Sequence, residues 1–551
     1  MPLFWHLVTR CAFRDSRTFA SSSASTPRLR LPSFSVFANA ARPENASKAA
    51  VVDADGVYSY ARLLRDAFML AQTDEMRTIK KGDRVAFLFP RQYPWVVAQW
   101  CAWMKECVAV PLSTSQPASE LAHVLSDAQA SIVIHHPSFG DVIKDAVADE
   151  RVVKRGGCRT LELNIPAHQN ASDSLVSQPQ TVDFTEINKE QGAMIIYTSG
   201  TTGKPKGVLT TFKNVEAHVS SLLSAWHWSS KDKILLVLPL HHVHGVINVV
   251  TCALAAGATL EMAPEKLTPA QTWERFLSPE QNLTLFMAVP TIYARLLENY
   301  DSSSLSKQKE MSAACSQFRL MVSGSAALPS PVFDRWERIS GHRLLERYGM
   351  TEIGMALGNR YDGPREPGRV GVPFPNVEVK IVDEVGRDVT SVEGASGELL
   401  VRGPQVFKEY WNNEAATRKT FQDDWFVTGD IVTVTKPHGS FQILGRASQD
   451  IIKSGGFKLS ALVIEREILS LEGVKDVAVV GVPDEVWGER VAAVIVVDCD
   501  RNRAVVENEL VTALKTRLAK YEVPTRWYFC DQIPRNAMGK VSKKGLVVLF
   551  K

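Results

Sequence analysis

The chain has 551 residues, of which 45% are hydrophobic and 22% are charged, so its composition is that of a folded protein and excludes extensive disorder. Lys and Arg total 63 and Asp and Glu total 60, and the resulting net charge of +3 is too small to indicate nucleic-acid binding. The length predicts roughly three to four domain-sized units.

The first 42 residues carry a charge that differs from the rest of the chain. They contain six Arg, no Lys and one acidic residue, Asp15, so their net charge is +5 and that of the remainder is −2. Arg, Ser and apolar residues with few acids are typical of a mitochondrial transit peptide, whereas a secretory signal needs an uninterrupted apolar run. We predict a transit peptide over residues 1–42 and a location in the mitochondrial matrix. The alternative is a tail without a targeting role.

Helical and strand patterns alternate beyond residue 45. Residues 60–71 have apolar side chains at helical spacing. Short apolar runs typical of buried parallel strands occupy residues 83–90, 108–111, 130–134 and 194–197. The apolar segment 245–260 is shorter than the roughly 20 residues of a membrane span, so we expect a core helix and no membrane-spanning segment. The alternation predicts a wound α/β fold.

The pattern changes near residue 368. Short alternating segments such as 377–382 and 397–402 are separated by Gly, Pro and Asn, which indicates antiparallel strands in a β-barrel-like subdomain. A polar stretch near residue 445 then precedes a compact α+β unit. We predict a large N-terminal α/β domain over residues 43–445, which includes the barrel-like part, and a small mobile α+β domain over residues 446–551.

The segment from Thr198 to Gly207 reads Thr-Ser-Gly-Thr-Thr-Gly-Lys-Pro-Lys-Gly and follows a predicted strand. Gly lets backbone N–H groups approach an oxyanion closely, hydroxyl groups donate further hydrogen bonds, and Lys adds positive charge. The segment therefore predicts a polyphosphate site. It is not a Walker A loop, because Lys204 is followed by Pro205. A flexible surface loop is the alternative.

This segment resembles the signature of the adenylate-forming superfamily, which comprises acyl-CoA synthetases, luciferases and the adenylation domains of peptide synthetases. Six further blocks resemble those of the superfamily and occur in the same order. They are Pro239-Leu-His-His-Val-His-Gly245, Tyr348-Gly-Met-Thr-Glu352, Trp425-Phe-Val-Thr-Gly-Asp430, Gly445-Arg446, Gly455-Gly456 and Pro534-Arg-Asn-Ala-Met-Gly-Lys540. The large domain with a small mobile C-terminal domain is the fold that this resemblance implies.

Members of this superfamily use ATP to convert a carboxylate into an acyl-adenylate, and then pass the acyl group to a thiol. Because the carboxylate is its own nucleophile, the site needs positioned donors, Mg²⁺ and Lys more than a general base. The resemblance implies that Thr351 contacts the α-phosphate, that Glu352 helps to hold Mg²⁺ and that Thr202 takes part in catalysis. It assigns the β- and γ-phosphates to Thr198, Ser199, Gly200, Thr201, Thr202, Gly203, Lys204, Pro205 and Lys206.

The resemblance also assigns residues to the nucleoside and to the reacting carboxylate. Asp430 would accept hydrogen bonds from both ribose hydroxyls with help from Arg446, and Tyr348 would stack on adenine. Lys540 would bridge the carboxylate and the α-phosphate during adenylation. Without their flanking motifs, Asp430, Arg446 and Lys540 would be interpreted as an ordinary turn residue and two solvated cations.

The small C-terminal domain of such enzymes rotates about a hinge just after the Gly-Arg pair. The present chain is one residue longer there than many relatives, so Ser448 and Gln449 are both candidates for the hinge residue. Gly455 and Gly456 would line the passage for the pantetheine arm of CoA.

Five segments resemble malonyl-CoA synthetases within this superfamily: 239–245, 289–295, 322–328, 346–352 and 361–368. A buried second carboxylate requires a cation, for which Arg offers bidentate geometry. The resemblance assigns this role to Arg295, with His244 and Ser323 as further donors and Met350 as another substrate contact. The alternative is that Arg295 is an exposed helix residue paired with Glu298.

We therefore expect an acid–thiol ligase that makes malonyl-CoA, or also methylmalonyl-CoA, from ATP and CoA with Mg²⁺, without a nucleic-acid or obligate protein partner. Three alternatives remain open: a medium-chain fatty acyl-CoA synthetase, an inactive nucleotide- or CoA-binding regulator, and an adenylation module that loads a carrier protein. An inactive regulator could have lost Glu352, Asp430 and Lys540, but all three are present. The eleven residues after Lys540 contain no evident carrier segment.

Overall fold

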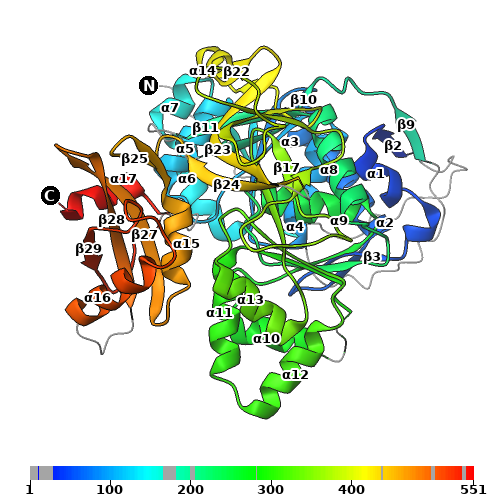
Figure 1. Ribbon diagram of the computed structural model, residues 1–551. Coiled ribbons are helices and arrows are strands. Elements are labelled where there is room, and N and C mark those ends of the chain that lie inside the picture. Colours follow the sequence, from blue (N-terminus) through cyan, green and yellow to red (C-terminus); the bar gives the residue numbers. More distant parts are fainter. Residues whose placement is uncertain are drawn as a thin grey trace, which may run out of the picture.

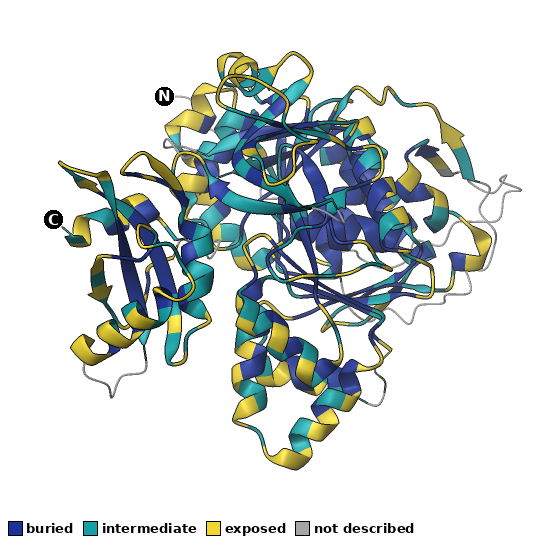
Figure 2. Ribbon diagram, in the orientation of Figure 1, coloured by how far each residue is buried: buried dark blue, intermediate teal, exposed yellow. Residues whose placement is uncertain are grey.

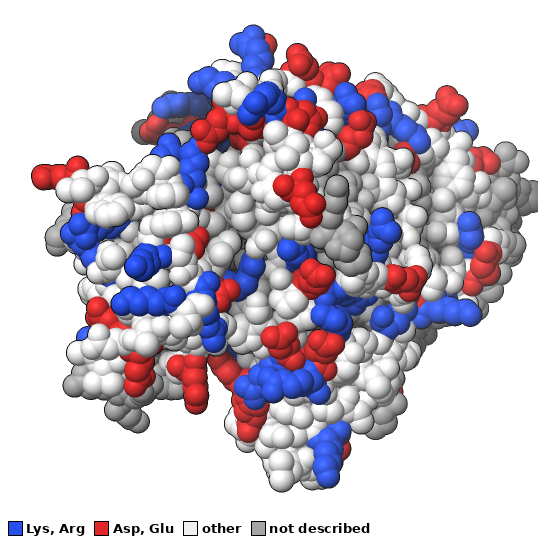
Figure 3. All heavy atoms as spheres, in the orientation of Figure 1, with Lys and Arg blue, Asp and Glu red and all other residues white. Residues whose placement is uncertain are grey.

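The computed structural model describes residues 10–11, 29–165, 182–198, 205–278, 280, 282–435, 439–497, 503–535 and 541–550. A large body carries sheets of eight, nine, five and two strands, and a smaller C-terminal unit with its own five-stranded sheet lies beside it (Figure 1). Positive and negative side chains are interspersed over the face in Figure 3, as expected from the small net charge. Within the described ranges, no helix is long and apolar enough to cross a membrane.

The eight-stranded sheet has a parallel centre, formed by the pairs β7–β5, β5–β6 and β6–β10. The strands in spatial order are β1 (Arg10–Cys11), β8 (Arg159–Leu163), β7 (Ile132–His135), β5 (Arg84–Leu88), β6 (Val108–Pro111), β10 (Gly192–Thr198), β11 (Lys206–Thr211) and β21 (Glu409–Tyr410). Helices α4 (Tyr93–Met104), α5 (Ala118–Ala128) and α6 (Gly140–Ala148) connect its strands. All four predicted strands are present, as β5, β6, β7 and β10, and their apolar side chains are buried as expected.

The nine-stranded sheet contributes much of the candidate site. Its strands in spatial order are β18 (Val372–Pro373), β17 (Gly354–Gly358), β16 (Leu345–Met350), β15 (Leu320–Gly324), β14 (Leu285–Ala288), β12 (Lys233–Leu236), β13 (Thr259–Met262), β3 (Ala49–Val52) and β4 (Val57–Ser59). The main helices around it are α2 (Tyr60–Ala71), α8 (Phe212–Ala225), α10 (Pro269–Leu277), α11 (Pro290–Asp301), α12 (Leu305–Cys315) and α13 (Ser330–Ser340). Helix α2 has the predicted bounds, and its first turn is capped by Ser59.

The apolar segment 245–260 differs from the single core helix that we predicted. It forms a π-helical segment, η4 (His244–Thr251), followed by the short α9 (Cys252–Ala255), and then enters β13. Gly257 makes this change of direction possible, because its φ of +72° is strained for other residues. Every residue of η4 is buried, as expected for a segment predicted to lie in the core.

A five-stranded antiparallel sheet follows, with β19 (Glu378–Val382), β20 (Ser396–Arg402), β22 (Phe421–Gln422), β23 (Trp425–Thr435) and β24 (Ser440–Arg446). The C-terminal unit contains β25 (Ile451–Ser454), β26 (Phe457–Ser460), α15 (Ala461–Leu469), β27 (Val474–Asp484), β28 (Gly488–Val497), α16 (Arg503–Leu514), β29 (Arg526–Phe529) and α17 (Lys543–Leu546). The chain therefore passes from one sheet to the other between Arg446 and Ile451. Figure 2 shows the central strands as buried and the outer helix faces as exposed.

Residues 29–42 belong to the folded body, which differs from the predicted boundary of the transit peptide at residue 42. Strand β2 (Leu29–Pro32) pairs in parallel with β9 (Val182–Thr185), and α1 (Ser35–Ala40) follows it. Phe34 is buried with its ring centroid 5.1 Å from those of both Trp103 and Phe212. Removing this segment would expose a large apolar surface, so a cleavable address would have to end before Leu29. Its cleavage would also remove the two-residue edge strand β1, which pairs with β8. Residues 1–9 and 12–28 lie outside the described ranges.

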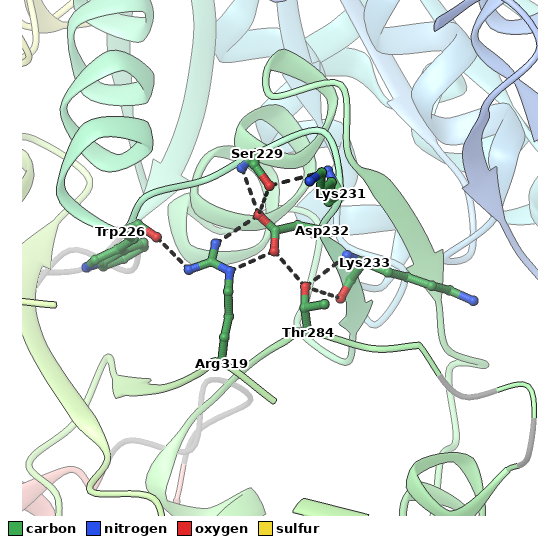
Figure 4. A network of polar contacts seen from close by, with 7 residues as sticks. All are labelled: Trp226, Ser229, Lys231, Asp232, Lys233, Thr284 and Arg319. Carbon is green, nitrogen blue, oxygen red and sulfur yellow. Dashed lines mark hydrogen bonds and ion pairs between the residues drawn. The ribbon is translucent and has the colours of Figure 1, made fainter. Parts of the chain in front are cut away.

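A polar cluster holds the amino ends of β12, β14 and β15 together (Figure 4). Asp232, which is 3% exposed, accepts two hydrogen bonds from Arg319, at 2.7 and 2.8 Å, and one from Thr284 at 2.7 Å. Arg319 also donates to the carbonyl oxygen of Trp226. Burial alone would raise the pKa of Asp232, but the hydrogen bonds from Arg319, Thr284 and Ser229 lower it below its ordinary value.

We predict that Arg319→Met lowers the free energy of unfolding by roughly 3–5 kcal/mol, because it leaves Asp232 buried without a cation. Urea denaturation followed by circular dichroism measures this loss. The control is Arg418→Met, which removes an exposed pair with Glu414 on α14 (Glu414–Thr420) and should cost less than about 1 kcal/mol. Equal losses in the two variants would contradict a structural role for the cluster.

Candidate active site

Three of the predicted nucleotide-binding residues lie together where the nine-stranded and five-stranded sheets meet. Asp430 on β23 is directly opposite Arg446 on β24, and the guanidinium contacts both carboxylate oxygens at 3.0 and 3.3 Å. The hydroxyl of Tyr348, on β16, donates to Asp430 at 2.5 Å. Burial and the neighbouring Asp430 raise the pKa of Tyr348, so the phenol stays protonated and can keep donating. The carboxylate is thereby held in one orientation.

Glu352, the predicted Mg²⁺ ligand, lies in the turn between β16 and β17 beside Thr351. One carboxylate oxygen of Glu352 accepts a hydrogen bond from Tyr410 at 2.8 Å. The ammonium of Lys206 lies 5.2 Å from the ring centroid of Tyr410, so the cation and the carboxylate are on the same side of the site. Glu352 is only partly buried, and its second carboxylate oxygen fits a single-carboxylate Mg²⁺ site completed by phosphates. The described residues contain no cluster of three or more His, Cys, Asp or Glu that could hold a metal without a substrate.

Tyr410 and His218 are site residues that the sequence did not identify. Tyr410 lies on β21, outside every recognised block, and it joins Glu352 to the eight-stranded sheet. His218, on α8, accepts the backbone N–H of Met355 at 3.2 Å, just after the Thr351–Glu352 turn. Burial, with Arg347 nearby, lowers the pKa of His218 to about 3, so the imidazole is neutral and remains an acceptor. Neither role has a sequence signal of its own.

The phosphate loop can be described only at its two ends. Strands β10 and β11 are antiparallel, and Thr198 pairs with Lys206, so these strands bring together the two ends of the segment. Ser199, Gly200, Thr201, Thr202, Gly203 and Lys204 lie outside the described residues. Lys540 also lies outside them, between Arg535 and Val541, which form an isolated antiparallel bridge. The roles of these residues therefore stay predictions.

A buried polar cluster lies at the carboxyl ends of β15 and β16. The hydroxyl of Ser325 contacts Nδ1 of His244 and the guanidinium of Arg347, both at 3.1 Å. Ser323, His244 and Arg347 are 0, 4 and 4% exposed. Nε of Arg347, Nε2 of His244 and Oγ of Ser323 have no hydrogen-bond partner within the described part of the chain. These buried donors and acceptors are available to a polar ligand.

Arg347 is the residue of this cluster that the sequence analysis missed. Its guanidinium lies against Gly324, since an ideal Cβ there would be only 2.6 Å from Cζ of Arg347. Burial lowers the pKa of Arg347 to about 9, which leaves it a cation at neutral pH. No Asp or Glu of the described ranges forms an ion pair with it. A buried cation without an acid is costly, and an anionic ligand would offset that cost.

Arg295 occupies a different environment from the one its predicted role suggested. It lies on α11, which starts just beyond the carboxyl end of β14, and its side chain is exposed. No hydrogen bond joins it to His244 or Ser323 in the described structure, and no ion pair joins it to Glu298 there. Met350 ends β16 and is partly buried.

The predicted CoA residues lie on the C-terminal unit, away from the cluster around Asp430. Gly455 and Gly456 form the exposed turn between β25 and β26, with φ of +57° and +84°. The two candidate hinge residues both lie in the turn between Arg446 and Ile451. Asp450 accepts the backbone N–H of Arg446 at 2.9 Å, and Lys543 pairs with both Asp450 and Glu465 at 2.6 and 2.8 Å.

Comparisons with known proteins agree with this architecture. Residues 37–411 match the AMP-binding enzyme family, and residues 463–540 match the AMP-binding enzyme C-terminal domain. The chain is 44% identical to the protein named malonate–CoA ligase ACSF3, mitochondrial, of Homo sapiens, over 91% of this chain and 90% of that protein. It is 36% identical to malonate–CoA ligase of Arabidopsis thaliana, with 97% and 90% covered. The crystal structure of ATP-bound MatB from Rhodopseudomonas palustris superposes with a TM-score of 0.81 at 31% identity, covering 95% and 100% of the two chains.

Proposed function

The chain belongs to the AMP-binding enzyme family, and we propose on this basis that it is an AMP-forming ligase that joins malonate to CoA. The observation that carries the choice of substrate is the buried guanidinium of Arg347, which has no acidic partner in the described structure and lies beside the unsatisfied atoms of His244 and Ser323. A dicarboxylate supplies one carboxylate for reaction and one for this cation. A medium-chain fatty acid would leave the cation buried and unpaired.

In the first half-reaction, an oxygen of the malonate carboxylate attacks the α-phosphorus of ATP. A new oxygen–phosphorus bond forms, the bond from the α-phosphorus to the bridging oxygen breaks, and pyrophosphate leaves. Asp430 would accept the ribose hydroxyls while Arg446 and Tyr348 hold its carboxylate in place. Thr351 would donate to the α-phosphate, and Lys540 would bridge it and the attacking carboxylate. Lys204 and Lys206 would offset phosphate charge.

In the second half-reaction, the CoA thiolate attacks the acyl carbon of the adenylate. The carbon–sulfur bond forms, the bond from carbon to the phosphate oxygen breaks, and AMP leaves with that oxygen. Mg²⁺, when bound, would neutralise phosphate charge, and Glu352 would hold it through the carboxylate oxygen that Tyr410 does not contact. Gly455 and Gly456 would admit the pantetheine arm, because they place no side chain in its way.

The substrate assignment predicts the behaviour of Arg347→Met. This variant should lower kcat/KM for malonate by about 100-fold and that for acetate by less than about 3-fold, because only malonate has a second carboxylate to pair. Steady-state AMP release with each acid measures the two values. Arg295→Ala, assayed in parallel, tests whether the exposed arginine contributes as well. Equal losses for malonate and acetate with Arg347→Met would overturn the assignment, as would faster turnover of octanoate than malonate by the unaltered enzyme.

The role assigned to Lys540 predicts a selective loss in one half-reaction. Lys540→Ala should abolish malonate-dependent ATP–pyrophosphate exchange, because the developing charge on the α-phosphate loses its cation. The reaction of preformed malonyl-adenylate with CoA should remain largely intact. Lys544→Ala, which alters an exposed lysine of the same segment, is the control. Normal exchange in the Lys540 variant would refute the role.

We also propose that the enzyme is mitochondrial and enters the matrix through a basic address that ends before Leu29. The net charge of residues 1–42 and the mitochondrial name of the human relative support this location. A fluorescent reporter fused to residues 1–28 should localise to the matrix in cells. The control replaces Arg10, Arg14 and Arg17 with Ala and should leave the reporter outside mitochondria. Matrix localisation of the control, or none with the intact segment, would contradict the proposal.

A further inference from the structure

The segment from Tyr361 to Gly368 has no role in the proposed reaction, yet it contacts the C-terminal unit. Gly368 has a φ of +76°, and an ideal Cβ on it would lie 2.3 Å from Cζ of Arg466 and 2.5 Å from both Nη atoms. The guanidinium of Arg466 therefore lies directly against the backbone of Gly368. Arg466 belongs to α15, the C-terminal helix that faces the large body in Figure 1. This contact joins the two domains.

Glu346 on β16 lies beneath this contact. It is 4% exposed, and one of its carboxylate oxygens accepts the backbone N–H of Gly368 at 2.8 Å. Burial raises the pKa of Glu346 to about 8, against the opposing effects of the Gly368 hydrogen bond and the charge of Arg466. The C-terminal domain thus places the cation of Arg466 near a buried carboxyl group of the large body. Arg369, which pairs with Glu366 at 3.0 Å, carries charge of the same sign as Arg466 nearby.

An exposed ion pair also joins the two domains, and its exposure means that it is expected to be weak. Lys458 on β26 pairs with Glu384, in the turn after β19, and their side chains are 50 and 72% exposed. Exposed pairs of this kind contribute about 0–1 kcal/mol. Helix α15 also packs near α13. Arg466, which is partly buried, is therefore a better candidate than Lys458 for the charged residue that holds the two domains together.

The orientation that contains this contact suits the first half-reaction better than the second. Gly455 and Gly456 are exposed here, so they do not line a passage between the domains. A rotation about the turn between Arg446 and Ile451 would be needed to bring them to the cleft. Because Arg466 and Gly368 lie on opposite sides of that turn in the chain, the same rotation would separate them.

We propose that Arg466 is a positioning residue that docks the C-terminal domain on Gly368 and Glu346 and thereby holds the enzyme in its adenylation orientation. The contact must break before CoA transfer. Its strength therefore sets the fraction of enzyme molecules in the orientation for each half-reaction. This proposal rests on the proposed function, since only a two-step ligase has these half-reactions. Arg466 does not touch the substrates and acts through the position of the domain that carries Lys540.

The test compares the two half-reactions in Arg466→Ala. Malonate-dependent ATP–pyrophosphate exchange should lose about 10-fold in kcat with the KM for malonate within about 2-fold, because the pocket is intact but less often closed. The reaction of preformed malonyl-adenylate with CoA should be unchanged or faster. Arg466→Lys, which keeps the charge, should recover part of the exchange. Arg503→Ala, which removes an exposed arginine of the same domain, is the matched control.

A double-mutant cycle with Glu346→Gln tests whether the two domains are coupled through this pair. Glu346→Gln alone should lower exchange, and adding Arg466→Ala should cost little more, because the electrostatic interaction between the two residues is already lost. Equal losses in both half-reactions, unchanged exchange, or additive effects would each overturn the proposal. If the unaltered enzyme exchanges pyrophosphate with another acid but not with malonate, the substrate assignment fails, and the Arg466 comparison can still be run with that acid.

Discussion

The cost of burying charged and polar side chains on one strand governs the arrangement of the site. Glu346, Arg347 and Tyr348 are consecutive on β16, and alternation along a strand directs Arg347 to the opposite face from its neighbours. Each buried group needs a partner. Gly368 and Arg466 serve Glu346, Ser325 serves Arg347, and Asp430 serves Tyr348. The partners come from the buried polar cluster around Ser325, the five-stranded sheet and the C-terminal domain, so a single strand brings three parts of the molecule to one place.

Features that depend on local sequence could be predicted. Apolar runs bounded by Gly and Pro indicated the parallel strands. The matched blocks assigned Asp430, Arg446 and Tyr348 to one site, and the three residues do lie together. The strands could be predicted because a strand buried on both faces is a continuous apolar run, and a strand buried on one face alternates apolar and polar residues. The proximity of these three residues could be predicted because each lies inside a block that resembles one of the superfamily's.

Features that depend on contacts between residues far apart in the sequence could not be predicted. Arg347 stands between two matched residues, but the sequence cannot reveal that no acid among the described residues forms an ion pair with it. The side chain of Arg295 is exposed, and its predicted role in the pocket stays a prediction. Tyr410 reaches Glu352 only because β21 pairs with β11 across the sheet. Composition also placed residues 29–42 with the basic leader, although Phe34 is held in the core by residues far away in the chain.

The pairing of β2 with β9 also bears on how the molecule assembles. Strand β2 lies near the start of the folded body and about 150 residues separate it from β9, so their pairing carries the entropy cost of closing a long loop. Contacts of such high sequence separation form slowly compared with local helices and adjacent strands. The beginning of the ordered chain is therefore expected to dock late, onto a body whose Trp103 and Phe212 surface has already formed. Until then, that aromatic surface is open to solvent and to other chains, which favours aggregation before the docking is complete.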